Sequence, residues 1–267
     1  MNRPLLTLLA ALGAIAFSLP QQDSARAHFE RGRALYEEHD DSGDAQQEAQ
    51  AEFRRALALD PKLAAAVAYL GFIAAENHPA EAEAAYRKAL QIDPQSPDAR
   101  VGLAWLHAGK GRFMEAIREL RLAVKADSVH RLARRELGFH LTAEGAQPTP
   151  EMWREAIESW KVLIRLDADD RDTHHDLARA CEHLGDWAAA EHHYREVLRI
   201  GQTPEDLDVW VYSVHGNVAQ MLERQGKYRE AIREYEALIA SEGVGAEEVS
   251  SARTRIDFLK HAPPGMC

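Results

Sequence analysis

The sequence predicts an all-α protein made of helix pairs stacked side by side. The chain of 267 residues is 46% apolar, and helix formers such as alanine, leucine, glutamate and arginine dominate it. Glycines and prolines gather between the periodic segments. No window alternates apolar and polar residues as a half-buried strand would. These three observations together favour helices over sheets.

The segment 97–128 shows the basic unit most clearly. Its first half carries apolar residues on one helical face, the stretch 109–111 with two glycines breaks the pattern, and a second apolar face resumes at Ala116, Leu120 and Ala123. A single pair of helices of this size cannot bury both apolar faces. We therefore expect similar pairs on either side of it.

The second helix of this unit recurs six times along the chain with the same spacing. A small residue comes first, at Ala49, Ala82, Ala116, Ala156, Ala190 and Ala231. A large residue follows four positions later, at Phe53, Tyr86, Leu120, Trp160, Tyr194 and Tyr235. A third apolar residue follows three positions after that, at Ala56, Ala89, Ala123, Leu163, Val197 and Leu238. Small residues let two helices cross closely, and large residues fill the space against the next pair.

This spacing, with Leu-Gly or Leu-Ala pairs in the first helices, resembles the tetratricopeptide repeat. The resemblance implies an all-α, right-handed superhelical α-solenoid of about six helix-turn-helix repeats over residues 25–243. The expected repeats are 25–61, 62–94, 95–128, 129–168, 169–202 and 203–243. A capping helix at 246–260 and a tail at 261–267 should complete the chain.

Three places depart from the regular spacing. Extra residues around 39–44 and around 145–150 predict two exposed loops. Thr203 and Pro204 resemble a helix N-cap and first position, so the first helix of the last repeat should run from there to about Gln225. In the capping helix, Val249, Ile256 and Leu259 share one side and are expected to cover the last repeat.

Residues 1–20 resemble a secretory signal peptide. A basic Arg3 precedes an apolar run from Leu5 to Phe17, and small residues place the cleavage site near 16–18. The run is short for a bilayer span, although an uncleaved anchor stays an alternative. We expect a soluble mature protein with no stable membrane span, periplasmic or secreted.

Several kinds of chemistry find no support in the residues. A net charge of −11 argues against non-specific nucleic-acid binding. No nucleophile elbow, phosphate-binding glycine loop or His-Glu-x-x-His helix is found, so we predict no catalytic residues, no enzyme activity and no cofactor. Two cysteines are too few for a disulfide framework, and Cys181 fits a small buried position in a helix.

A histidine-rich stretch leaves a metal- or haem-handling protein as an alternative. It contains His174, His175, His183, His192 and His193. His174 and Cys181 lie seven residues apart, roughly 10 Å along a helix, which is too far for both to reach one zinc ion. The position four residues after His175 holds Arg179. We therefore predict no metal site.

The resemblance also implies a function, which is binding of a protein or peptide in the concave groove lined by the first helices. By register, the groove residues are Phe72, Val101, Trp105, Arg135, Phe139, His175 and Arg179. Three consecutive aromatic residues should form a row with cationic residues at one end. The expected role is a scaffold or adaptor in a cell-envelope or secretion assembly, and a ligand-free structural scaffold is the alternative.

A local excess of basic residues could steer an acidic ligand to the middle of the chain. Between 112 and 135 the basic residues are Arg112, Arg118, Arg121, Lys125, Arg131, Arg134 and Arg135, against three acidic residues. The alternative is that these side chains pair with carboxylates of neighbouring helices.

Overall fold

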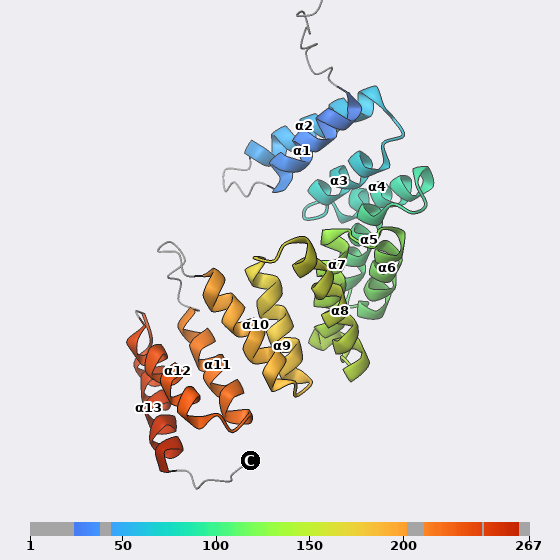
Figure 1. The fold of residues 1–267 in the computed structure, drawn as a ribbon. Coiled ribbons are helices and arrows are strands. Elements are labelled where there is room, and N and C mark those ends of the chain that lie inside the picture. Colours follow the sequence, from blue (N-terminus) through green and yellow to red (C-terminus); the bar gives the residue numbers. More distant parts are fainter. Residues whose placement is uncertain (1–23, 38–43, 202–210, 242, 262–267) are drawn as a thin grey trace, which may run out of the picture. The chain divides into compact units, whose positions relative to one another are not determined.

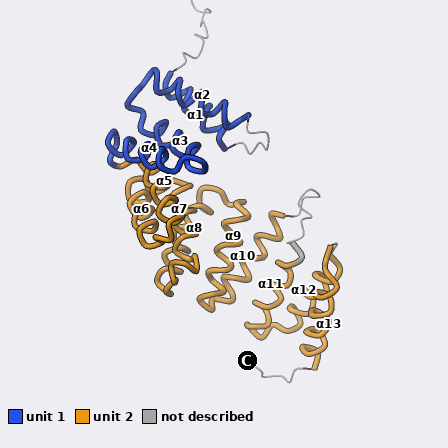
Figure 2. The backbone as a smooth tube through the Cα atoms, turned by 180° about the vertical axis from the view of Figure 1, so that it is seen from behind, with its two compact units in different colours: residues 1–94 blue, residues 95–267 orange. Residues whose placement is uncertain are grey.

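The structure, a computed structural model, describes residues 24–37, 44–201, 211–241 and 243–261. These residues form thirteen α-helices and one short 3₁₀-helix, and no strand (Figure 1). The chain divides into two compact units, residues 1–94 and 95–267 (Figure 2). The predicted all-α fold is therefore confirmed.

The first unit holds four helices, and the second holds the other nine. The first unit contains α1 (Ala25–Glu37), α2 (Asp44–Leu59), α3 (Ala64–Ala74) and α4 (Pro79–Ile92). The second begins with α5 (Pro97–Gly109), α6 (Phe113–Ala126), α7 (Arg131–Thr142), the 3₁₀-helix η1 (Glu144–Ala146) and α8 (Pro150–Leu166). It continues with α9 (Arg171–His183), α10 (Trp187–Ile200), α11 (Val211–Arg224), α12 (Tyr228–Ala240) and α13 (Ala246–His261).

Consecutive helices pair with each other, as the sequence predicts. The pairs are α1–α2, α3–α4, α5–α6, α7–α8, α9–α10 and α11–α12. Neighbouring pairs within a unit meet through α2–α3, α6–α7, α8–α9 and α10–α11, and α12 contacts α13. Within each unit, a pair thus buries its apolar faces between its own two helices and against the adjoining pair.

The core follows the predicted spacing of small and large residues in the second helices. All six alanines of the first set have no exposed surface, and the large residues four positions later are all buried. The third set, from Ala56 to Leu238, is buried as well. This part of the sequence prediction is confirmed.

The large residues of the second helices also pack against the first helix of their own pair, whereas the sequence predicted packing against the next pair. A Cβ atom added at Gly71 would lie 2.6 Å from the ring of Tyr86, and one added at Gly138 would overlap the indole of Trp160. Each ring therefore fills the space above a glycine in the first helix of its own pair. Contact with the next pair also exists, since the rings of Phe53 and Tyr69 have centroids 5.2 Å apart.

Turns and caps explain where the helices start and stop. Gly111, Gly185 and Gly226 occupy the turn inside three pairs with φ of 71°, 77° and 74°, a conformation that favours glycine. At helix starts, the side chains of Thr149 and Asp170 accept hydrogen bonds from the backbone N–H groups of Met152 and Thr173.

The predicted loop around 145–150 is only partly a loop. Residues Glu144–Ala146 form η1, Ala146 is buried, and α8 already begins at Pro150. The close approach of Gly145 to the ring of Phe113 explains this, because the segment folds back onto α6. The segment thus begins with a short helical turn that contacts α6 and α7, and residues 147–149 form the expected loop, in which Gln147 and Thr149 are exposed.

Some predictions lie outside the described residues. These are the signal peptide at 1–20, most of the loop at 39–44, the helix start at Thr203 and the tail after residue 261. The repeat count and the handedness of the superhelix stay predictions. In the capping helix α13, Ala252, Ile256 and Leu259 are buried. None of the helices in the described ranges is both long and apolar enough to cross a membrane.

Candidate binding surface

The predicted groove residues fall in both units, with Phe72 in the first and the other six in the second. Phe72 is 5% exposed, and its ring centroid lies 6.2, 5.0 and 5.7 Å from those of Tyr36, Tyr69 and Tyr86. It belongs to the aromatic core of its unit. The expected row of three accessible aromatic rings therefore loses its first member, because Tyr36 of α1 packs on the face that was assigned to a ligand.

Val101 and Trp105 lie on α5 at the start of the second unit. Val101 has no exposed surface, so a ligand cannot contact its side chain either. Trp105 is half-buried, and its indole N–H donates a 2.7 Å hydrogen bond to Oε2 of Glu136 on α7. Burial raises the pKa of the Glu136 carboxyl above its usual value. This hydrogen bond holds Trp105 against the neighbouring pair.

Phe139 is the accessible aromatic of the predicted row. Its side chain on α7 is 60% exposed, more than any other large apolar side chain in the described ranges, and its ring meets His140 edge-on with centroids 5.3 Å apart. An exposed phenyl ring of this kind has apolar surface that a partner could bury.

The cationic end of the predicted groove contains one paired and one unpaired arginine. Arg135 donates to Oδ2 of Asp170 at 3.1 Å. Although burial raises the pKa of Asp170, hydrogen bonds from Thr173 and the charge of Arg135 bring it below its usual value. Arg179 is exposed and forms no ion pair with any residue that the structure describes. His175 is half-buried, and its pKa is lowered by burial and by Arg179.

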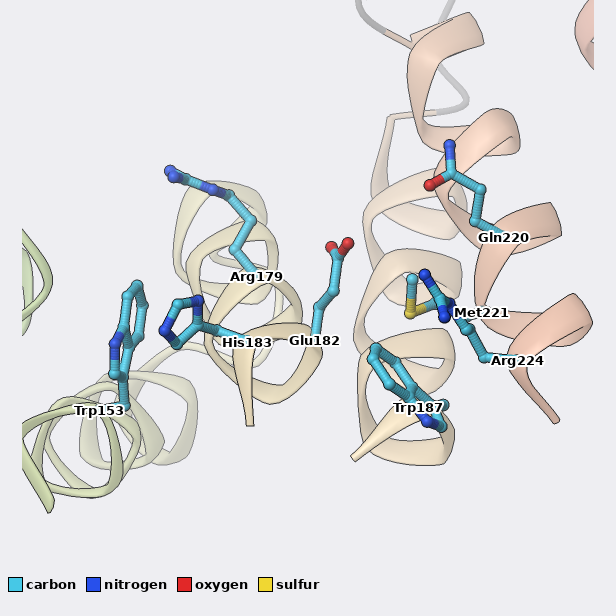
Figure 3. A pocket seen from close by; sticks show the side chains of 8 residues that line it. All are labelled: Trp153, Arg179, Glu182, His183, Trp187, Gln220, Met221 and Arg224. Atoms are coloured by element: carbon cyan, nitrogen blue, oxygen red, sulfur yellow. The ribbon is translucent and has the colours of Figure 1, made fainter. Parts of the chain in front are cut away.

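A pocket of about 470 Å³ opens next to Arg179 in the second unit (Figure 3). Eight residues from four helices line it: Trp153 of α8, Arg179, Glu182 and His183 of α9, Trp187 of α10, and Gln220, Met221 and Arg224 of α11. Arg179 was the one predicted site residue among them.

Two stacked pairs form opposite walls of this pocket. The His183 ring lies on the Trp153 indole with centroids 4.2 Å apart, and the guanidinium of Arg224 lies 5.4 Å from the Trp187 ring centroid. Figure 3 shows Glu182 between the two walls, and its Oε2 accepts a 3.0 Å hydrogen bond from the Tyr194 hydroxyl. The lining therefore combines aromatic surface with two arginines and one engaged carboxylate.

The sequence carried a partial signal for this pocket. In the family register, Glu182 and His183 occupy positions twelve and thirteen of a first helix, which are groove positions, and Arg224 is the equivalent of His183 in the next pair. Trp153 and Trp187 belong to second helices, which that register does not assign to the groove. They therefore could not be found in this way.

Three of the seven basic residues in the predicted basic section pair with carboxylates of other helices. Arg121 donates two hydrogen bonds to Glu155, at 2.8 and 2.6 Å, and Arg131 and Arg135 both approach Asp170. This pairing lowers the net positive field that could steer a ligand. Steering by this section stays a prediction.

The histidine-rich stretch forms hydrogen bonds within the α9–α10 pair. Nε2 of His174 lies 3.1 Å from the carbonyl oxygen of Ala168, which only accepts, so Nε2 donates this hydrogen bond. Nδ1 of His174 lies 3.0 Å from Nδ1 of His193. Across the described ranges, no three histidine, cysteine, aspartate or glutamate residues gather as a metal ion would require. Cys181 is buried, which raises the pKa of its thiol to about 11.

Comparison with known families decides the identity of the repeats. Three family models, each described as a tetratricopeptide repeat, match residues 47–97, 74–134 and 169–241, together more than half of the chain. The chain belongs to the tetratricopeptide repeat (TPR) family. The comparison with curated proteins found no match to this sequence.

Solved structures share this TPR fold at low sequence identity. PilF of Pseudomonas aeruginosa is 18% identical with a TM-score of 0.59, over 86% of this chain and 96% of that chain. PilW, described as a widely conserved type IV pilus biogenesis factor, is 17% identical with a TM-score of 0.55, over 85% and 97%. The Cut9–Hcn1 structure from the APC/C is 16% identical with a TM-score of 0.55, over 89% of this chain and 44% of that chain.

Proposed function

We propose that this TPR protein is an exported, non-catalytic interaction module that binds a protein or peptide segment on the first helices of its second unit. The observation that carries the proposal is Phe139 of α7, whose side chain is 60% exposed and which the family register assigns to the groove. Burial of such a ring against a partner contributes about 1.5–3 kcal/mol. Arg135 lies one turn before Phe139 on α7, and Arg179 and the pocket beside α9 offer polar groups on the following helix pair.

The proposed cellular role is that of a scaffold or adaptor in a cell-envelope or secretion assembly. PilW, a structure of the same fold, is described as a type IV pilus biogenesis factor. Residues 1–20 of this chain have the composition of a secretory signal. Fractionation of the native cells tests the location, since the proposal requires the mature protein in the envelope or the medium, and full-length protein in the cytosol would contradict it.

A comparison of two exposed phenylalanines tests the binding surface. Phe139→Ala removes the ring on α7, and the control Phe258→Ala removes a ring on α13 that is 50% exposed. We expect wild-type chain and Phe258→Ala to recover the same proteins from an envelope fraction in the same amounts, and Phe139→Ala to recover at least tenfold less of one of them.

Thermal unfolding of the variants separates loss of binding from loss of folding. Because both rings are exposed, neither substitution is expected to move the melting temperature by more than a few degrees. Equal recovery by all three chains would favour the alternative of a structural scaffold that binds no ligand on this face.

A further inference from the structure

We propose that the pocket between α9 and α11 anchors an acidic residue of the bound segment together with the apolar residue next to it. The inference rests on the proposed function and specifies the chemistry of the segment that the second unit binds. Its evidence is the arrangement of two arginines, two indoles and one carboxylate in a pocket of about 470 Å³, a size within the roughly 300–1,000 Å³ of small-ligand sites.

Two arginines of the pocket lining, Arg179 and Arg224, make the pocket locally positive. Arg179 and Arg224 come from neighbouring helix pairs, and neither forms an ion pair with any residue in the described ranges. Most arginines near the pocket are paired, for example Arg195 with Glu191 and Glu234, at 2.9 and 3.1 Å. In a chain of net charge −11, two unpaired guanidinium groups at one pocket are a local positive site.

The described carboxylates near these arginines do not form ion pairs with them. Asp176 of α9 interacts electrostatically with Arg179 but forms no ion pair with it and does not line the pocket. Glu223, next to Arg224 in the chain, accepts from Arg255 and from the Tyr235 hydroxyl. Glu191 accepts from Gln225 and Lys227. Both carboxylates are therefore occupied by partners outside the pocket. Glu182 is the one acidic residue among the eight residues that line the pocket. It accepts a hydrogen bond from the Tyr194 hydroxyl.

The Trp187 ring restricts the side chain of Arg224. Its guanidinium carbon lies 5.4 Å from the centroid of the Trp187 ring, which restricts the side chain without using its N–H groups. A planar guanidinium held in this way can donate two parallel hydrogen bonds to a carboxylate with little further loss of side-chain freedom. An acidic side chain is thus the ligand group that fits this wall best.

The rings in the pocket lining fit an apolar residue next to the acidic residue of the ligand. Trp187 and His183 lie on opposite sides of the pocket, with Glu182 between them (Figure 3). The His183 ring stacks on the Trp153 indole. An aliphatic or aromatic side chain placed between these rings would bury apolar surface on both faces. A basic side chain is disfavoured, because the lining carries two arginines against one carboxylate.

An array of ten-residue peptides with randomised flanks and defined central pairs tests the proposal. The central pairs are Glu-Leu, Gln-Leu, Lys-Leu and Glu-Ser, and binding of the full chain is measured by fluorescence polarisation. We expect Glu-Leu peptides to bind at least tenfold more tightly than Gln-Leu or Glu-Ser peptides, and Lys-Leu peptides to bind most weakly. Raising the salt concentration should weaken binding of the Glu-Leu peptides more than that of the Gln-Leu peptides.

Variants of the pocket connect this preference to its residues. Arg179→Gln and Arg224→Gln should each lower the affinity for Glu-Leu peptides about tenfold, and leave the weak binding of Gln-Leu peptides unchanged. Arg253→Gln is the matched control, because Arg253 is an exposed arginine of α13. Equal melting temperatures of these variants and the wild-type chain would show that the pocket variants are folded.

The outcomes separate this inference from the proposed function. Equal binding of Glu-Leu and Gln-Leu peptides, or unchanged binding by both arginine variants, would overturn the acidic anchor. Failure of every peptide to bind wild-type chain would overturn it as well. In each of these cases the comparison of Phe139→Ala with Phe258→Ala still decides whether the second unit binds a protein partner at all.

Discussion

Asp176 is a carboxyl group whose environment opposes its charge. Burial raises its pKa to about 6, although Arg179 and Arg135 act in the opposite direction. The folded chain therefore binds this proton more tightly than the unfolded chain, so stability falls as pH rises from about 4 to about 6 and stays lower above that.

Replacing Asp176 by asparagine should remove this cost. Because the side chain is partly exposed and solvent screens it, we expect Asp176→Asn to stabilise the chain by only about 1 kcal/mol at pH 7 and by nothing at pH 3. Urea unfolding at the two pH values checks this. Glu236→Gln, at an exposed position on α12, is the control. An equal effect of both variants would contradict the assignment.

His193 responds to pH with the opposite sign. Burial, together with His174 and His192, lowers its pKa to about 4. The unfolded chain then takes up the proton first, so His193 contributes stability that is complete above about pH 6.5 and is lost as pH falls toward 4.

His193→Gln should therefore flatten the acid side of the stability profile. After allowance for solvent screening, we expect the wild-type chain to lose about 1–2 kcal/mol more than the variant between pH 7 and pH 4.5. His78→Gln, which replaces an exposed histidine that does not act on His193, serves as control. Comparison with wild type at each pH is needed, because Asp176 acts in the opposite direction over the same range. Parallel stability curves for wild type and His193→Gln would refute the prediction.

At the scale of the helix pair, the contact of Gly138 with Trp160 sets the crossing of α7 and α8. Gly138→Ala would improve the helix by up to about 1 kcal/mol, but its Cβ would overlap an indole that is 3% exposed. Overpacking of this kind costs about 1–3 kcal/mol, so we expect a net loss of about 1 kcal/mol or more.

Gly109→Ala is a matched control for that substitution. Gly109 is the last residue of α5, and a Cβ there would meet nothing within 4 Å. The same chemical change should therefore be neutral or slightly stabilising. Chemical unfolding of both variants gives the comparison, and similar effects of the two would mean that the crossing adjusts freely around Trp160.

The spacing of residues along one helix predicts the core, but it predicts the candidate site only in part. The register of the second helices is local, since Ala116, Leu120 and Ala123 follow from spacing along one helix. The burial of Phe72 depends on Tyr36, a residue of the preceding pair whose reach the spacing does not encode. Likewise, Asp170 at a helix N-terminus pairs with Arg135 across helices, and no spacing rule distinguishes that arginine from unpaired Arg179.

Within a unit, a stack of helix pairs distributes stability differently from a globular core. Each pair is held mainly by its neighbours, so the effect of a substitution should decay along the stack. Ile256 tests this, because it is buried on α13, and α13 contacts α12 at the end of the second unit.

Ile256→Ala deletes buried methyl groups, which costs about 2–5 kcal/mol where a cavity stays open. We expect amide hydrogen exchange to accelerate in α13 and α12, while protection of α5–α8 stays as in the wild-type chain, because those helices pack on other pairs. Phe258→Ala, which removes an exposed ring of the same helix, should leave the exchange pattern unchanged. A uniform loss of protection from α5 to α13 would instead mean that the second unit opens as one cooperative body.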